Sequence, residues 1–325
     1  MPAPRDSAAV VRAARLYYEQ ECSQSEVARE LGISRSNVSR ILAQARERGI
    51  VEILIHDPEA PPVRDTELEE QLARTFGLDE AVVVSATRGT GLDVVSRAAA
   101  QAIAERAPKV RSIGVSWGQT LQRVVAELPT LSLRPRPRVL PLVGGLTALD
   151  QLASGDSVLR VLAERMGATP EPLFAPALVQ SAAAQRTFRG EASIASVLGA
   201  AAQVELGLVG IGSIDLYSSP HLVQGMHLDA AELRTFETQG AVGDLCGRFV
   251  DRLGRPLGPP TSERVLAVTF EELREIPEVL GVAAGAEKAP GVLGVLRSGV
   301  LQSIVVDAQL ADAVLARASA EPMPR

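Results

Sequence analysis

The chain has 325 residues, of which 46% are hydrophobic and 22% are charged. This length and composition are typical of a folded protein with two domains and exclude a disordered chain. A net charge of −6 and a pI near 5.3 exclude a general DNA binder, because non-specific affinity comes from neutralising many phosphates. We find no signal-like apolar segment at the start and no run of about 18 apolar residues, so we expect a cytoplasmic protein without membrane contact.

The first predicted feature is a helix-turn-helix over residues 24–44. Ser23 and Glu26 can form a capping box at the start of the first helix. Gly32 suits the positive φ of the turn, and Ser34 can cap the second helix. Buried positions then recur on the second helix at i, i+3, i+4 and i+7: Val38, Ile41, Leu42 and Ala45.

The other side of the second helix carries side chains that can recognise DNA. Arg pairs with guanine, Asn pairs with adenine, and Ser bonds base edges or phosphate. The N-terminal half of a recognition helix is the part that reaches the bases. An ordinary solvated helix pair is the alternative, but turn, caps and apolar stripe all agree with the DNA-binding interpretation. The residues expected to contact double-stranded operator DNA are Ser34, Arg35, Ser36, Asn37, Ser39 and Arg40.

Residues 1–57, the predicted DNA-binding domain, are formally neutral, with eight Arg and eight acidic residues. One such unit should bind weakly, so we expect a homo-oligomer, a dimer or a tetramer, that places several copies on one operator. Gly49 can end the second helix. Residues 50–55 are then expected to form a short strand, as in winged helix-turn-helix domains.

Residues 58–64 form a predicted proline-rich linker, because proline lacks an N–H group and fixes φ. The second domain is expected to span residues 65–325. It begins with a helix that Thr66 and Glu69 can cap. Short apolar runs then alternate with helical stretches, which predicts an α/β domain with a mostly parallel sheet covered on both faces. The predicted strands are residues 81–84, 112–116, 138–143, 204–211, 264–270, 279–284 and 300–306.

Several of these runs end in glycine and a small polar residue. In open α/β sheets the ligand crevice lies outside the carboxyl ends of the strands, and glycines there let N–H groups approach an anion. A helix that begins at Gln119 or Thr120 would add its dipole. The alternative is that the fold itself needs glycines at such turns; several of them together favour a polar ligand. The candidate ligand-binding residues are Ser116, Trp117, Gly118, Thr120, Gly144, Gly145, Gly212, Ser213, Asp244 and Lys288.

No spacing predicts a catalytic residue, a metal site or a cofactor. His221 and His227 are expected on the surface or in loops, and no histidine stands at metal-ligand spacing with a carboxylate or cysteine. Cys22 and Cys246 fit no zinc or redox spacing. We therefore do not expect an enzyme, although a lone Lys, Asp or Glu can act as the base in sugar-phosphate chemistry.

The chain resembles the SorC family of bacterial sugar-responsive transcriptional regulators in five segments that follow one another in the same order. These segments are the helix-turn-helix, Leu72–Leu78, the Ser116 loop, residues 240–244 and residues 285–299. The similarity runs from about residue 10 to about residue 315. It implies an effector domain related to phosphosugar isomerases and CoA transferases. It also implies oligomerisation through that domain, and a DNA affinity that a sugar, polyol or phosphosugar alters.

The resemblance also implies roles for single residues. The loop from Ser116 to Thr120 would cradle an anion, Asp244 would hold sugar hydroxyls, and Lys288 would reach the ligand. Trp117 departs from the Ser or Thr of many relatives, and its indole could stack on a sugar, crowd out a phosphate or fill the core. Two other functions remain open: a sugar-phosphate isomerase-like enzyme with a DNA-binding arm, and a constitutive DNA-binding protein whose second domain only oligomerises.

Overall fold

The computed structural model describes residues 7–20, 22–47, 50–51, 63–85, 90–146, 155–214, 216 and 219–322. The chain forms two compact units, residues 1–60 and 61–325. The first unit is helical, with a small core of its own centred on Val27, Val38 and Leu42. Its elements are α1 (Ser7–Ala14), the π-helical turn η1 (Arg15–Glu19), α2 (Gln24–Leu31) and α3 (Arg35–Glu47).

The local signals of the helix-turn-helix are confirmed. The Ser23 hydroxyl accepts a hydrogen bond from the Glu26 amide at 3.3 Å, and the Glu26 carboxylate accepts one from the Ser23 amide at 2.8 Å. Gly32 ends α2 with φ at +64°, a conformation that a Cβ atom disfavours. The Ser34 hydroxyl accepts a hydrogen bond from the Asn37 amide at 3.3 Å and so caps α3.

The expected wing strand is only partly covered by the described residues. Ile50 and Val51 are bends, and both of their amides donate to the Ala45 carbonyl at the end of α3. Residues 52–55 of the predicted strand, and residues 58–62 of the predicted linker, lie outside the described residues.

The second unit is built on one large, mostly parallel sheet. The strand order is β1-β2-β10-β9-β6-β3-β4-β5, and only β1 runs antiparallel to its neighbour. Past the region where β6 pairs with β9, the end of β6 pairs with the antiparallel hairpin β7–β8. The strands are β1 (Val63–Arg64), β2 (Glu80–Ser85), β3 (Ser112–Val115), β4 (Arg138–Pro141), β5 (Thr169–Pro170), β6 (Leu206–Ser213), β7 (Ala241–Leu245), β8 (Arg248–Asp251), β9 (Glu278–Val282) and β10 (Ser303–Asp307).

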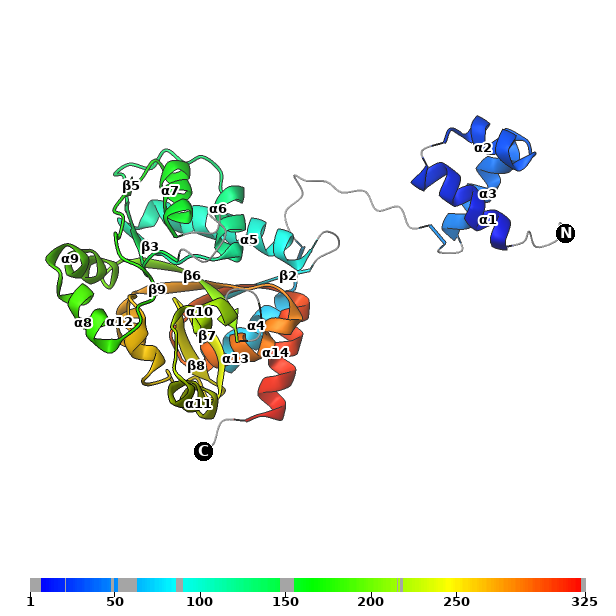
Figure 1. Cartoon of the computed structure of the whole chain (residues 1–325). Helices are drawn as coiled ribbons and strands as arrows, with labels where there is room; N and C mark the ends of the chain where they lie inside the picture. Colours follow the sequence, from blue (N-terminus) through cyan, green and yellow to red (C-terminus); the bar gives the residue numbers. More distant parts are fainter. Residues whose placement is uncertain are drawn as a thin grey trace. The chain divides into compact units, whose positions relative to one another are not determined.

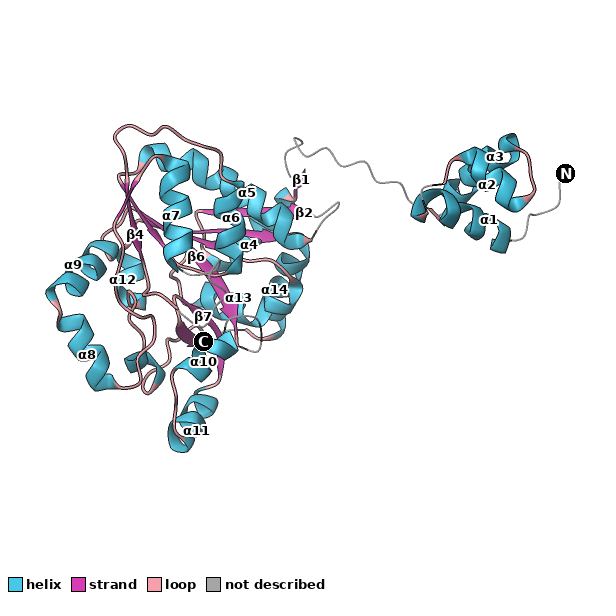
Figure 2. Ribbon diagram, turned by 45° about the horizontal axis from the view of Figure 1, so that its top comes forward, coloured by secondary structure: helices cyan, strands magenta, loops and turns pink. Residues whose placement is uncertain are grey.

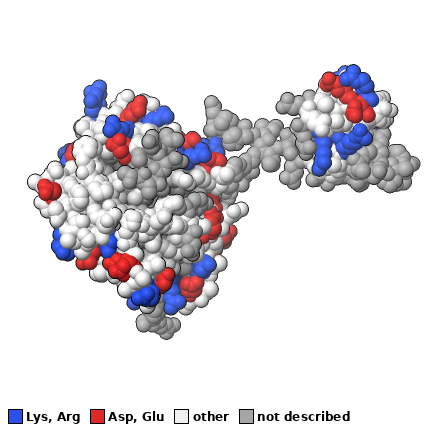
Figure 3. All heavy atoms as spheres, in the orientation of Figure 1, with Lys and Arg blue, Asp and Glu red and all other residues white. Residues whose placement is uncertain are grey.

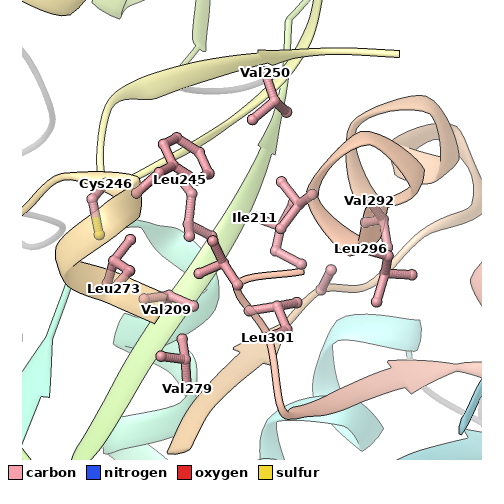
Figure 4. Packing of buried hydrophobic residues seen from close by; sticks show 14 of the residues in the cluster. Val209, Ile211, Leu245, Cys246, Val250, Leu273, Val279, Val292, Leu296 and Leu301 are labelled. Carbon is pink, nitrogen blue, oxygen red and sulfur yellow. The ribbon is translucent and has the colours of Figure 1, made fainter. Parts of the chain in front are cut away.

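Helices cover both faces of this sheet, as the all-apolar strands require. One face carries α5 (Gly91–Arg106), α6 (Gln119–Glu127) and α7 (Gly155–Met166). The opposite face carries α4 (Thr66–Phe76), α13 (Ala289–Arg297) and α14 (Ala308–Ala320). Figure 4 shows Ile211 of β6 beside Val292 and Leu296 of α13. The remaining helical elements are η2 (Ala107–Lys109), α8 (Ala182–Gly190), α9 (Ala192–Ala201), α10 (Ser219–Gly225), α11 (Ala230–Gln239), η4 (Thr261–Arg264), α12 (Phe270–Glu275) and η5 (Ala286–Lys288).

The predicted strand at residues 264–270 is wrong, whereas the other six runs lie on strands of the sheet. In the structure this run makes only isolated bridges, at Val265 and Ala267. Its last residues enter α12, because Thr269 and Glu272 form a capping box. Apolar composition cannot separate such a buried connection from a strand of the sheet.

The cap of α4 also differs from the expectation. Asp65 is the N-cap, and its carboxylate accepts a hydrogen bond from the Leu68 amide at 3.2 Å. Glu69, expected in a capping box with Thr66, is instead buried against the sheet edge, where it accepts a hydrogen bond from the Val83 amide at 2.9 Å. Asp and Thr are both favourable N-cap residues. Because Asp65 and Thr66 are neighbours, the sequence allowed α4 to begin at either of two positions one residue apart.

Candidate functional site

The predicted DNA-binding residues lie at the start of α3, on the side away from the small core. Ser34, Arg35, Ser36, Ser39 and Arg40 are exposed, and Asn37 is half-buried. The Ser34 hydroxyl lies 3.0 Å from that of Ser36. Basic and acidic side chains are interspersed over the described surface in view, on this unit and on the other (Figure 3).

The second unit contains a cavity of roughly 430 Å³ where β3, β6, β9 and β10 end. This is the position that open α/β sheets use for ligands. Segments about 220 residues apart in sequence form its walls, from Thr90 to Gln309. Seven of the ten candidate ligand-binding residues line it: Ser116, Trp117, Gly118, Thr120, Gly212, Asp244 and Lys288.

Asp244 is the buried carboxylate of this cavity. β7 carries it, and the Ser219 hydroxyl donates a hydrogen bond to its Oδ1 at 2.5 Å. Burial raises the pKa of Asp244 above its ordinary value, whereas the bonds from Ser219 and the Gly247 amide, and the charge of Lys288, oppose this shift. A carboxylate held in this way can accept hydrogen bonds from ligand hydroxyls.

Lys288 supplies the matching cation. It ends η5 directly before α13, is 8% exposed, and its Nζ donates to the Ile211 carbonyl of β6 at 3.5 Å. Burial lowers the pKa of Lys288, while the charges of Asp244, Glu287 and Asp307 oppose the shift. An ammonium group of this kind can donate to a ligand oxygen from a largely desolvated position.

The loop before α6 provides the polar wall opposite. Gly118, with φ at +125°, is the N-cap of α6 and gives the helix no side-chain cap. The first turn of a helix leaves N–H groups without acceptors inside the helix, and its dipole favours negative charge there. The helix start predicted at Gln119 or Thr120 is confirmed at Gln119. The Ser116 hydroxyl accepts a hydrogen bond from the Gly210 amide at 3.3 Å, which joins the loop to β6.

Trp117 is 7% exposed and belongs to the hydrophobic core as well as to the cavity wall. Its indole N–H donates to the Gly144 carbonyl at 2.9 Å, which fixes the ring edge inside the protein. The sequence allows three roles for Trp117: stacking on a sugar, crowding out a phosphate and filling the core. Filling the core accounts for most of the surface of its side chain.

The structure does not place three of the candidate ligand-binding residues, Gly144, Gly145 and Ser213, in the lining of this cavity. A Cβ at Gly144 would lie 2.4 Å from the Pro176 carbonyl oxygen, so this glycine serves a close approach of two chain segments. Gly145 bonds to that same segment through Ala175. Ser213 pairs with Gly243 of β7 and is buried in the sheet.

Several cavity residues were missed by sequence reasoning. Asp307 directly follows the predicted strand at 300–306, so the rule about carboxyl strand ends could have found it. His221, expected on the surface or in a loop, is exposed at the start of α10 and still lines the cavity. Cys246 and Gly247 form the tight turn between β7 and β8, with φ at +52° and +74°, and the hairpin had not been predicted.

Cys246 lines the cavity as a thiol, and its burial raises its pKa to about 12. Within the part of the chain that is described, no group of three His, Cys, Asp or Glu side chains could hold a metal ion. None of the described helices is long and apolar enough to cross a membrane.

Comparison with known protein families matches both units. Residues 60–316 match the Sugar-bind family, a sugar-binding domain, and residues 12–48 match Sigma-70, region 4. The sorbitol operon regulator of Klebsiella pneumoniae is 29% identical over 94% of this chain and 97% of its own. The erythritol catabolism regulatory protein EryD of Brucella abortus is 26% identical over 96% of this chain and 98% of its own. The crystal structure of the full-length Klebsiella regulator SorC superposes with a TM-score of 0.71 at 29% identity, covering 94% of this chain and 98% of that one.

A helix-turn-helix unit joined to a sugar-binding α/β domain defines the class of ligand-responsive transcriptional regulators. The relatives that match this chain over almost its whole length are transcriptional regulators. The chain belongs to the SorC family.

Proposed function

We propose that this protein is a transcriptional regulator whose operator affinity is controlled by a sugar, polyol or phosphosugar held in the cavity of the second unit. The observation that carries the proposal is that one buried carboxylate, Asp244, and one buried ammonium, Lys288, line the same cavity at the carboxyl ends of parallel strands. A small number of placed polar groups in a concave site is what a specific ligand needs. The names of the relatives, which include regulators of sorbitol and erythritol use, support the same ligand class.

Each polar group has a proposed part in ligand binding. Asp244 accepts hydrogen bonds from hydroxyls, and Lys288 donates to a ligand oxygen. The α6 start, with Ser116 and Thr120, receives the most electronegative end of the ligand, whether hydroxyl or phosphate. Ligand is bound and released unchanged, which an assay for turnover of pentose and hexose phosphates checks.

We further propose that residues 1–57 bind DNA through Ser34 to Asn37, Ser39 and Arg40, that residues 58–64 link the units, and that residues 65–325 bind the effector and hold a dimer or tetramer in the cytoplasm. Several copies are needed because residues 1–57 are formally neutral. Sedimentation of the full chain and of residues 65–325 tests the oligomer directly.

A ligand screen tests the regulator proposal. Thermal unfolding of the full chain is followed with sorbitol, erythritol, deoxyribose, other pentoses and hexoses, and their phosphates. A ligand at 100 times its dissociation constant adds about 2.7 kcal/mol to the free energy of unfolding. A hit must also change the affinity for a duplex that the full chain selects from a randomised library. A panel with no stabilising compound, or a hit without effect on DNA, contradicts the proposal.

Variants assign the effect to the cavity. Asp244→Ala and Lys288→Ala should bind the selected duplex as the wild type does and lose most of the response to the hit, because coupling needs differential contacts with the ligand. Lys109→Ala is the matched control, since Lys109 is the only other lysine and is exposed on η2. An undiminished response to the hit in both cavity variants would contradict the proposal that the ligand binds in this cavity.

A further inference from the structure

The first described element after the segment that joins the two units is β1, one of the two shortest strands of the sheet. β1 has only two residues, which pair antiparallel with β2 as Val63 with Ser85 and Arg64 with Val84. It is an edge strand, because β2 has β10 on its other side. So short a strand makes few ladder bonds and would open easily on its own.

A bidentate ion pair holds β1 in place. The Arg64 guanidinium donates from Nε to Oε1 of Glu69 at 2.7 Å and from Nη2 to Oε2 at 3.0 Å. The Glu69 side chain is 11% exposed and that of Arg64 is 48% exposed, so the pair is buried at its carboxylate end and reached by water at its guanidinium end. Its hydrogen bonds raise the pKa of Arg64.

Glu69 binds both strands at once. Its Oε1 also accepts a hydrogen bond from the Val83 amide of β2 at 2.9 Å. The Asp65 amide donates to the Val83 carbonyl at 2.8 Å, while the Asp65 carbonyl is taken by the Glu69 amide at the start of α4. The Glu69 carboxylate therefore accepts the hydrogen bond from the Val83 amide that the Asp65 carbonyl would accept if β1 were longer. We call Arg64, Glu69 and their bonds to β2 the β1 clasp.

The clasp stands in register with the ligand cavity. Arg64 pairs with Val84 of β2, and Val84 pairs with Asp307 of β10. Neighbouring strands lie about 4.8 Å apart, so the backbone of Arg64 is about 10 Å from that of Asp307. Asp307 lines the cavity, and its Oδ2 accepts a hydrogen bond from the amide of Gly285, another wall residue, at 2.7 Å.

Asp307 also contacts a second part of the cavity wall, the start of α5, which follows β2 in the chain. A Cβ at Gly91 would lie 3.1 Å from Oδ2 of Asp307, so the start of α5 packs directly against that carboxylate. A ligand that contacts Gly91, Gly285 or Asp307 therefore acts on the carboxyl ends of β2 and β10 together. β1 is paired with this end of β2, and the same end of β2 is paired with β10.

We propose that the β1 clasp is the element that couples ligand occupancy of the cavity to the DNA-binding unit. With the clasp closed, β1 follows the ends of β2 and β10, and the covalent chain carries that constraint toward residues 1–60. With the clasp broken, the two-residue strand detaches and the two sites become independent. This inference rests on the proposed function, because it presumes that DNA and ligand influence one another.

Reciprocity of coupling allows a test that needs no identified ligand. If the sites are coupled, DNA binding must also alter the affinity of the cavity for its ligand, and we expect the wall at Asp307 to change with it. The probe is the duplex selected by the full chain from a randomised library. Hydrogen exchange of the Gly285 amide, which donates to Asp307, is measured in the full chain with and without that duplex.

Three variants make the test specific. Arg64→Gln removes the guanidinium, and Glu69→Gln removes the charge but keeps an oxygen for the Val83 amide. Arg74→Gln is the control, because Arg74 pairs with Glu70 on the same helix at 3.1 Å, with both side chains 69% exposed and no bond to β1. Denaturant midpoints of all three are compared, so that loss of folding is recognised.

In the wild type and in Arg74→Gln, DNA should change exchange at Gly285 by at least about fivefold, the lower end of typical allosteric coupling. In Arg64→Gln and Glu69→Gln, DNA affinity should be unchanged and the effect at Gly285 should fall below about twofold. A full effect in either clasp variant overturns the inference. A wild type that binds DNA without an effect at Gly285 also overturns it, whereas failure to select any duplex refutes the proposed function as well.

Discussion

The substitution Gly212→Ala tests whether the position of the Asp244 carboxylate decides ligand binding. A Cβ at Gly212 would lie 1.9 Å from Oδ1 of Asp244 and 2.7 Å from the Ser219 hydroxyl. These two atoms already share a hydrogen bond of 2.5 Å. Contacts of a Cβ below 3.0 Å essentially never occur, so the carboxylate must retreat by about 1 Å in a packed interior.

The magnitude follows from what this retreat breaks. A hydrogen bond to a charged group contributes about 1.5–3 kcal/mol, and overpacking a core costs about 1–3 kcal/mol. Alanine recovers part of this by restricting the unfolded chain, about 0.4–1 kcal/mol. Together these contributions should lower the free energy of unfolding by about 2–5 kcal/mol. Ligand affinity should fall by about 10-fold to 150-fold, which corresponds to one lost charged hydrogen bond.

Denaturant unfolding measures the first quantity and ligand-induced thermal stabilisation the second. Gly210→Ala is the control, because Gly210 lies two residues earlier on β6 and also lines the cavity. A Cβ there would meet nothing closer than the Trp117 carbonyl oxygen at 3.8 Å. If Gly212→Ala keeps the wild-type midpoint and ligand response, or if Gly210→Ala is equally damaging, the reasoning from Asp244 fails.

Three further predictions concern DNA, assembly and pH. Arg40→Ala should weaken binding of the selected duplex by about 1–3 kcal/mol with an unchanged circular dichroism spectrum, because Arg40 is exposed on α3; unchanged binding at fixed salt would count against this face of the helix. A fragment of residues 1–60 should bind that duplex far more weakly than the full chain, and equal affinities in a titration would refute the need for several copies. Burial raises the pKa of Asp244 above 3.8, so its protonation stabilises the native state below about pH 4, and this stabilisation is lost as pH rises through the raised pKa. The difference in unfolding free energy between wild type and Asp244→Asn should therefore fall as pH rises from about 4, and a difference that stays constant would contradict the assignment.

The helix-turn-helix could be predicted closely because its signals are local. The capping box of Ser23 and Glu26, the positive φ of Gly32 and the burial of Val38 each depend on residues within one or two turns. Six strands of the sheet could be predicted for a related reason, since a strand buried on both faces must be apolar throughout. The run at 264–270 obeys the same composition without joining the sheet, so composition alone could not reject it.

The cavity could be predicted only in part, because its residues meet through tertiary structure. Asp244 and Lys288 belong to segments that the resemblance implied, and their positions follow from where β7 and η5 lie. Gly144 looked equivalent to Gly212, since both follow apolar runs that end in glycine. The structure separates them: the chain after β4 packs against residues 175–177, whereas the end of β6 opens toward Asp244. Nothing in the sequence near Gly144 encodes that neighbour.

The choice of lysine at position 288 is informative because the chain uses arginine almost everywhere else, with two lysines among 33 basic residues. Buried arginines here are satisfied by several acceptors. Arg264, for example, is 8% exposed and donates to the carbonyls of Gln180 and Met226 and to the Glu232 carboxylate. A guanidinium has five donors in a fixed plane, and a cavity that satisfied them all would have no donor left for a ligand. An ammonium group is compact and has only three donors. Lys288 thus places a compact, largely buried positive charge in the cavity wall, whereas an arginine at this position would need acceptors for five donors in one plane.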